Sequence, residues 1–97
     1  MHIGVCRLRI HIPASQSLKD KRQVVKSIIT RLRNTHNMSV MEVDSHDLWQ
    51  IATLGIACVG IEPTALRELM YRTVDQVASN SHGAEVVEHE VDVLSLF

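Results

Sequence analysis

Aromatic residues, prolines and cysteines are all scarce in this chain of 97 residues. It contains one tryptophan, one tyrosine and one phenylalanine, with two prolines and two cysteines. Cys6 and Cys58 stand 52 positions apart, outside any CxxC or local Cys/His cluster, so they do not resemble the disulfide framework of a small secreted domain. We interpret them as reduced thiols that act as small core residues, as is typical of a cytoplasmic protein.

Long hydrophobic runs are also missing. The longest uninterrupted run of apolar residues and glycine covers 54–61, far short of the roughly 18 residues that suggest a membrane span. The first four residues show no charged segment followed by an apolar one, so we expect no secretory signal. Charged residues make up 22% and hydrophobic residues 45%, which is ordinary globular composition. We therefore predict one cytoplasmic domain over residues 1–97, without membrane contact.

The net charge of −1 hides a strong asymmetry along the chain. Residues 1–33 hold eight Lys and Arg against one acid, a net of +7, whereas residues 34–97 hold two against ten acids, a net of −8. Charge asymmetry of this kind between two halves of a chain indicates a charged partner.

Hydrophobic periodicity divides the chain into six elements. Alternation and β-branched residues predict strands at 2–12, 38–44, 48–60 and 85–94, with the middle two joined by a short hairpin connection at 45–47. Apolar stripes predict one helix over 17–35, opened by a capping box of Ser17 and Asp20, and a second helix that opens at 62–64. Residues 80–83 should end the second helix, with Gly83 as a left-handed cap.

The element order β-α-β-β-α-β is the split βαβ pattern of ferredoxin-like domains. We therefore predict an α+β fold, a ferredoxin-like βαββαβ sandwich with a four-stranded antiparallel sheet and two helices on one face. Right-handed crossovers make the first and third strands central and leave the other face of the sheet free of helices.

The free face should carry both charge and apolar surface. Strand alternation places Arg7 and Arg9 opposite acids of the last strand, which predicts cross-strand ion pairs with Glu88 and Glu90. The apolar part of this face, a candidate homodimer surface, would consist of Ile3, Val5, Ile51, Thr53, Ala57 and Val59. The alternative is a smaller patch, shielded by Trp49 and the charged fringe. Because the first strand has no aromatic residue, base stacking on the sheet face is not expected.

The first predicted helix carries cations that helix stability does not explain. They are Lys19, Lys21, Arg22, Lys26 and Arg33. The first three lie in the first turn, where the helix dipole disfavours positive charge, whereas a phosphate at a helix N-terminus would be favoured. We expect these residues to contact RNA or another phosphate-bearing partner; the alternative is a solvated helix face.

A second group of chemically capable residues lies near the hairpin, at Glu42, Asp44, His46 and Asp47. Their spacing matches no common metal-ligand pattern, and no nucleophile elbow, phosphate-binding loop or dinucleotide fingerprint is present. We therefore predict no metal site, no cofactor and no catalytic residue, and interpret the protein as a non-enzyme; an enzyme that uses these four residues is the third alternative.

Several segments resemble one family of proteins. Ser17-Leu18-Lys19-Asp20-Lys21-Arg22 resembles the SLK(E/D)KR motif of the YlxP-like family, small bacterial domains of unknown function, and segments 39–44, 47–50 and 54–57 resemble its central hairpin. The resemblance runs from about residue 3 to residue 93 and implies a ferredoxin-like fold. It singles out Lys19, Lys21 and Arg22 and, with no known role, Glu42, Asp44, Asp47, Trp49 and Gln50.

The genes of such proteins often lie between those of translation initiation factor two and ribosome-binding factor A, which implies a role around ribosome assembly or translation. The sequence thus leads us to expect a module that contacts ribosomal RNA or a ribonucleoprotein through its first helix. The alternative is a homodimeric interaction module that uses the free sheet face.

Overall fold

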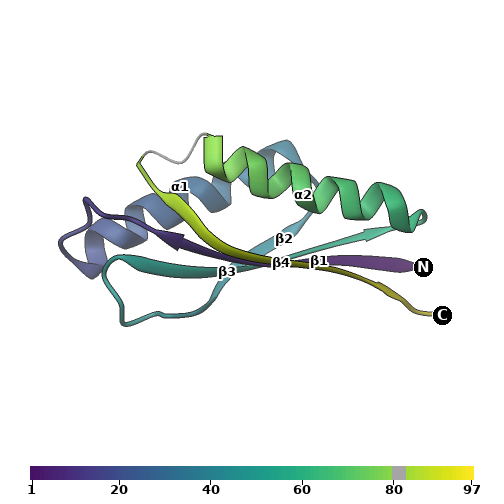
Figure 1. Cartoon of the computed structure of the whole chain (residues 1–97), viewed down its shortest axis with the longest axis horizontal. Coiled ribbons are helices and arrows are strands. Elements are labelled where there is room, and N and C mark those ends of the chain that lie inside the picture. The colour runs from purple at the N-terminus through teal and green to yellow at the C-terminus, as the bar shows by residue number, and fades with distance from the viewer. Residues whose placement is uncertain (80–82) are drawn as a thin grey trace.

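The computed structural model describes residues 1–79 and 83–97 and has two layers, a sheet and a pair of helices that cover one of its faces (Figure 1). The elements in chain order are β1 (His2–His11), α1 (Leu18–Thr35), β2 (Ser39–Asp44), β3 (Ile51–Gly60), α2 (Pro63–Ser79) and β4 (Glu85–Ser95). The four strands form one antiparallel sheet in the order β2-β3-β1-β4. The predicted ferredoxin-like α+β fold is confirmed, with β1 and β3 central.

The core lies between the sheet and the helices. Alternate residues of the two central strands point into it, and the helices contribute stripes with a period of three to four residues. Its fully buried side chains include Leu8, Ile10, Leu32, Leu54 and Met70. No helix in the described ranges is both long enough and apolar enough to cross a membrane.

Both helices begin at a side-chain cap. The hydroxyl of Ser17 accepts a hydrogen bond from the backbone N of Asp20 at 3.0 Å, as the capping box predicts. The carboxylate of Glu62 accepts from the backbone N of Thr64 at 3.1 Å and of Ala65 at 2.7 Å, and these two hydrogen bonds lower the pKa of Glu62. Gly83 has the left-handed φ of +85° that its predicted role requires, whereas the rest of the predicted stop, 80–82, lies outside the described residues.

Two irregularities correct the predicted strands. β3 begins at Ile51 rather than at 48, so the connection from β2 covers 45–50, and a register shift separates Glu42 from Asp44 in the ladder to β3. In β4 a second shift, opposite Arg9 and Ile10, leaves Val87 exposed, whereas Val86 and Val91 pack against the core. Such shifts insert a residue into one strand and reverse the side on which later residues point.

Candidate functional site

Lys21 is the most deeply buried charged residue of the described chain. Its ammonium donates hydrogen bonds to the backbone oxygens of Ser45, His46 and Ile51 at 2.8, 3.2 and 3.2 Å. It also lies 3.0 Å from Oε2 of Glu42, and the Lys21 side chain is only 1% exposed. Since an ammonium has three hydrogens to donate, three carbonyls and a carboxylate occupy it fully. The expectation that Lys21 contacts a phosphate at the surface is therefore wrong.

The sequence did contain a signal for this burial. Positions 21, 25, 28 and 32 follow the helical spacing of the core-facing stripe, and the three residues after Lys21 in this series, Val25, Ile28 and Leu32, are all buried. The charge of Lys21 obscured its place on that stripe. What no local pattern reveals is its set of partners, because the carbonyls come from a loop 24 or more residues further along the chain.

Gln50 holds the same loop from its other side. Its Nε2 donates to the backbone oxygens of Pro13 and Ser15, each at 3.1 Å, and its own backbone oxygen accepts from Ile12 at 2.7 Å. Together with Lys21 and Glu42, Gln50 joins the β2–β3 loop to the start of α1 and to the β1–α1 connection. We call these three residues and the carbonyls that they bind the loop clamp.

The remaining residues of the family-signature hairpin divide between structure and surface. Asp44 accepts from the backbone N of Ser45 at 2.7 Å, which stabilises the turn where Ser45 adopts a left-handed φ of +63°. Asp47 and Trp49 are exposed, and the indole lies in the loop rather than at the start of β3. The structure therefore assigns a structural role to Glu42, Asp44 and Gln50 and leaves Asp47 and Trp49 accessible.

Three exposed cations of α1 form what we call the basic stripe. Lys19, Arg22 and Lys26 are exposed and lie on one side of the helix, because their spacing of three and four residues is close to a helical turn. Within the described ranges, none of these three side chains makes a hydrogen bond or an ion pair. Arg33 lies on the same side one to two turns beyond, but its Nη2 donates to the backbone oxygen of Val40 at 2.6 Å.

The free face of the sheet carries the predicted ion pairs. The guanidinium of Arg7 pairs with Glu90, and that of Arg9 lies 3.8 Å from Glu88. These pairs are largely exposed and add little stability, but they neutralise both arginines. Arg7 and Arg9 are thus excluded from the basic surface, as the strand pattern predicted.

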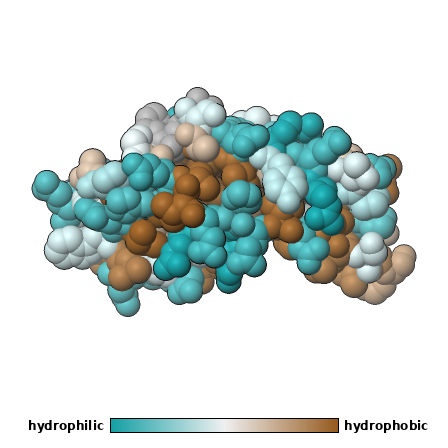
Figure 2. Space-filling view, viewed as in Figure 1, coloured by the Kyte–Doolittle hydropathy of each residue, from teal (hydrophilic) through white to brown (hydrophobic). Residues whose placement is uncertain are grey.

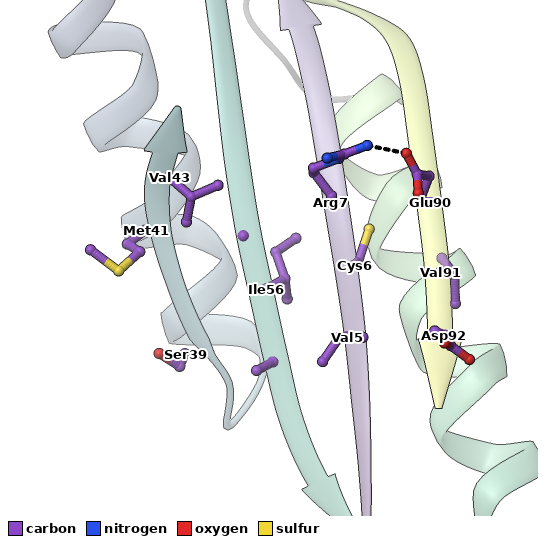
Figure 3. A pocket seen from close by; sticks show the side chains of 12 residues that line it. Val5, Cys6, Arg7, Ser39, Met41, Val43, Ile56, Glu90, Val91 and Asp92 are labelled. Atoms are coloured by element: carbon purple, nitrogen blue, oxygen red, sulfur yellow. Dashed lines mark hydrogen bonds and ion pairs between the residues drawn. The ribbon is translucent and has the colours of Figure 1, made fainter. Parts of the chain in front are cut away.

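The free face also holds a shallow hollow of about 600 Å³, which crosses all four strands (Figure 3). Met41 of β2 and Asp92 of β4 lie at its sides, and Val5, Gly55 and Ala57 of the two central strands contribute to its floor. A Cβ at Gly55 would stand 2.7 Å from Cγ1 of Val43, so Val43 packs directly over the bare backbone. Met41 and Val43 were not among the residues predicted for this face; the register Met41↔Gly55, which the strand pattern could not supply, places them there.

The predicted dimer face is only partly available to a partner. Ile3, Val5, Ala57 and Val59 lie on the free face, where Ile3 pairs with Val59 on one side and with Leu94 on the other. Thr53 is 6% exposed because Ser45 covers it, with their hydroxyls 2.9 Å apart, so its predicted place on an interface is wrong. Ile51 is half-buried, and its carbonyl belongs to the loop clamp.

Neither cysteine forms a disulfide. Cys6 is buried, and burial raises the pKa of its thiol to about 11, which suppresses the reactive thiolate. Cys58 is half-buried against the core, and its thiol donates to the backbone oxygen of Asn37. In residues 1–79 and 83–97, no group of three or more His, Cys, Asp or Glu side chains is placed to hold a metal ion.

Comparison with known proteins identifies the family of this chain. The family described as "Protein of unknown function (DUF503)" matches residues 3–91. The chain belongs to this family. The uncharacterized protein YlxP of Bacillus subtilis (strain 168) is 42% identical over 57 residues, which cover 59% of this chain and 62% of that relative. The match thus spans less than two thirds of the relative's length, and neither description states an activity.

A likeness to a solved structure concerns the fold alone. The de novo designed protein Foldit4 superposes with a TM-score of 0.53 at 15% sequence identity, over 98% of this chain and 99% of that one. A designed protein with this architecture underlines that the fold by itself specifies no function, so function has to be argued from the site.

Proposed function

We propose that this protein is a non-enzymatic cytoplasmic module that binds RNA through the basic stripe on α1. The partner is ribosomal RNA or a ribonucleoprotein. The observation that supports this proposal most is the absence, within the described ranges, of any acidic or carbonyl partner for Lys19, Arg22 and Lys26. Three cations on one side of a helix leave a positive field that an anionic polymer can neutralise.

Several cations in the first third of the chain already have partners within the protein and are not available to RNA. Lys21 is used by the loop clamp, and Arg7 and Arg9 by ion pairs. Of the eight Lys and Arg side chains in residues 1–33, three therefore remain without a partner in the described ranges, because Arg31 has an interaction of its own and Arg33 donates to the backbone oxygen of Val40. From Lys19 to Arg33 the distance along the helix is about 21 Å at 1.5 Å per residue, which is enough to follow several phosphates.

Co-sedimentation with purified ribosomal subunits, over a series of salt concentrations, tests this proposal. The variant Lys19→Glu/Lys26→Glu should lose binding at low salt. The matched control Arg67→Glu/Arg72→Glu changes the net charge equally at two exposed positions of α2 and should bind like the unsubstituted protein. Equal losses of binding in both variants would show that net charge alone determines the affinity. Undiminished binding of Lys19→Glu/Lys26→Glu would exclude the basic stripe as the binding surface.

A second candidate function, homodimerisation through the free face, is favoured by one specific observation. Ile3, Val59 and Leu94 form an apolar row across three strands at the end where both termini lie, and Figure 2 shows hydrophobic surface at this end. In such a dimer, the end of one copy that carries the termini would stack on the same end of the other copy, so that apolar surface covers apolar surface. Both sets of ion pairs would stay at the edge of the interface.

Light scattering over a concentration series tests the dimer. Val59, the most exposed of the residues predicted for this face at 64%, is the position to change. A dimer that Val59→Lys converts to a monomer, while Tyr71→Lys on α2 does not, supports the second candidate. A protein that is monomeric at the highest concentration contradicts it.

A further inference from the structure

The indole of Trp49 is presented to solvent by a short loop. Its side chain is 57% exposed, and the preceding Leu48 is 48% exposed. A single exposed apolar residue is ordinary, but an exposed indole is the largest flat apolar surface that a side chain can offer. Trp49 is also the only tryptophan in the sequence, so its surroundings can be followed without interference.

The loop that carries Trp49 is fixed on both sides of the indole. Lys21 binds the carbonyls of Ser45 and His46 before it and that of Ile51 after it. Gln50, the next residue, binds two carbonyls of the β1–α1 connection. Burial of a lysine and a glutamate costs free energy, and removal of one partner from such a pair costs more. Because the tip of the loop packs against nothing in the core, these buried contacts serve to fix the position of the loop itself.

This loop lies at the same end of the molecule as the start of the basic stripe. Lys21 occupies the first turns of α1 together with Lys19 and Arg22, and the clamp fastens the loop to that turn. Figure 1 shows the β2–β3 connection and the start of α1 together, at the end opposite the two termini. An exposed indole and unpaired cations are thus held at one end by a common set of hydrogen bonds.

From this placement we infer that Trp49 stacks on an unpaired base of an RNA strand whose phosphates contact Lys19 and Arg22, so that the ligand is single-stranded RNA. Proteins that bind single strands combine cations that follow the backbone with aromatic side chains that stack on bases, and a duplex offers no free base face to an indole. This inference rests on the proposed RNA-binding function and adds to it the strandedness of the ligand and a second contact.

The intrinsic fluorescence of the protein provides the test, because it arises from Trp49 with little contribution from one tyrosine. Titration with a short oligouridine should quench and shift the emission, whereas the same RNA in a duplex should not. In parallel, the anisotropy of a labelled oligouridine gives the affinity. Trp49→Ala should weaken binding at least about fivefold, whereas Leu48→Ala, at the neighbouring exposed position, should leave it unchanged.

The outcomes separate this inference from the function on which it rests. If oligouridine binds in a salt-dependent manner but Trp49 emission stays constant and Trp49→Ala binds equally well, the stacking contact is wrong and the basic stripe stands. Equal affinity for the duplex, with no quenching, likewise overturns single-strand binding alone. If neither oligouridine nor duplex binds to the unsubstituted protein, both proposals fail.

Discussion

At the scale of single residues, burial determines which charged side chains are available to a partner. Lys21 and Lys19 belong to the same motif and the same helix and carry the same charge. They lie on different sides of the helix, so Lys21 is in the core and Lys19 is at the surface. The sequence allowed the helix and its stripe to be predicted, and position 21 lies on that stripe. The partners of Lys21 could not be predicted, because they are main-chain carbonyls whose convergence depends on the conformation of a distant loop.

Replacement of Lys21 measures how much the loop clamp contributes to the free energy of unfolding. Lys21→Met keeps most of the buried volume but leaves the carboxylate of Glu42 and three carbonyls without their ammonium. We expect the free energy of unfolding to fall by about 3–5 kcal/mol, as for other buried pairs that lose one partner. Lys26→Met, an exposed position one to two turns away, should change it by about 0.5 kcal/mol or less.

Urea denaturation, followed by circular dichroism, measures both variants. The double variant Lys21→Met/Glu42→Gln should recover part of the loss, because it removes the unpaired charge of Glu42 but not the unsatisfied carbonyls. A midpoint for Lys21→Met equal to that of Lys26→Met would contradict the assignment of Lys21 to the core.

At the scale of elements, regular segments followed from the sequence and irregular ones did not. The first helix was predicted to within one residue, because its apolar stripe and its Ser17 cap are local signals. The start of β3 was misplaced by three residues, because Leu48 and Trp49 look like strand residues, whereas tertiary hydrogen bonds from Lys21 and Gln50 hold them in a loop. The register of β2, and with it the free-face position of Met41, depends on the same loop.

The cap of α2 predicts a pH dependence of stability. Hydrogen bonds from two backbone N–H groups lower the pKa of Glu62 below its ordinary value of 4.5, so the folded state favours the ionised carboxylate. This stabilisation is fully present above the pKa of Glu62 in the unfolded chain and is lost as the pH falls through the lower, folded-state pKa. Glu62→Gln should therefore destabilise the protein at neutral pH, and the difference should shrink below about pH 4.5.

Thermal unfolding from pH 7 down to pH 3 measures this difference, with Glu68→Gln on the exposed side of the same helix as the matched control. A gap between the unsubstituted protein and Glu62→Gln that stays constant over the whole range would show that the carboxylate does not act as a charged cap.

At the scale of the whole molecule, the arrangement of charge connects the fold to the proposed function. The sheet neutralises its own arginines, the loop clamp buries one lysine, and α1 keeps three cations exposed on one side. The sequence predicted both the ion pairs and the basic helix, since each follows from residue periodicity. It did not predict that the loop clamp would hold the indole and the stripe at one end, because no sequence pattern records which loops meet.

The central claim, that the basic stripe neutralises RNA phosphates, is tested most directly by the salt dependence of RNA affinity. Each phosphate contact to a single strand contributes about −0.7 to the slope of log affinity against log salt concentration, so three cations predict a slope of about −2. Lys26→Gln should make the slope shallower by about 0.7, and Arg72→Gln on α2 should leave it unchanged. Identical slopes for the unsubstituted protein and for Lys26→Gln would contradict the account.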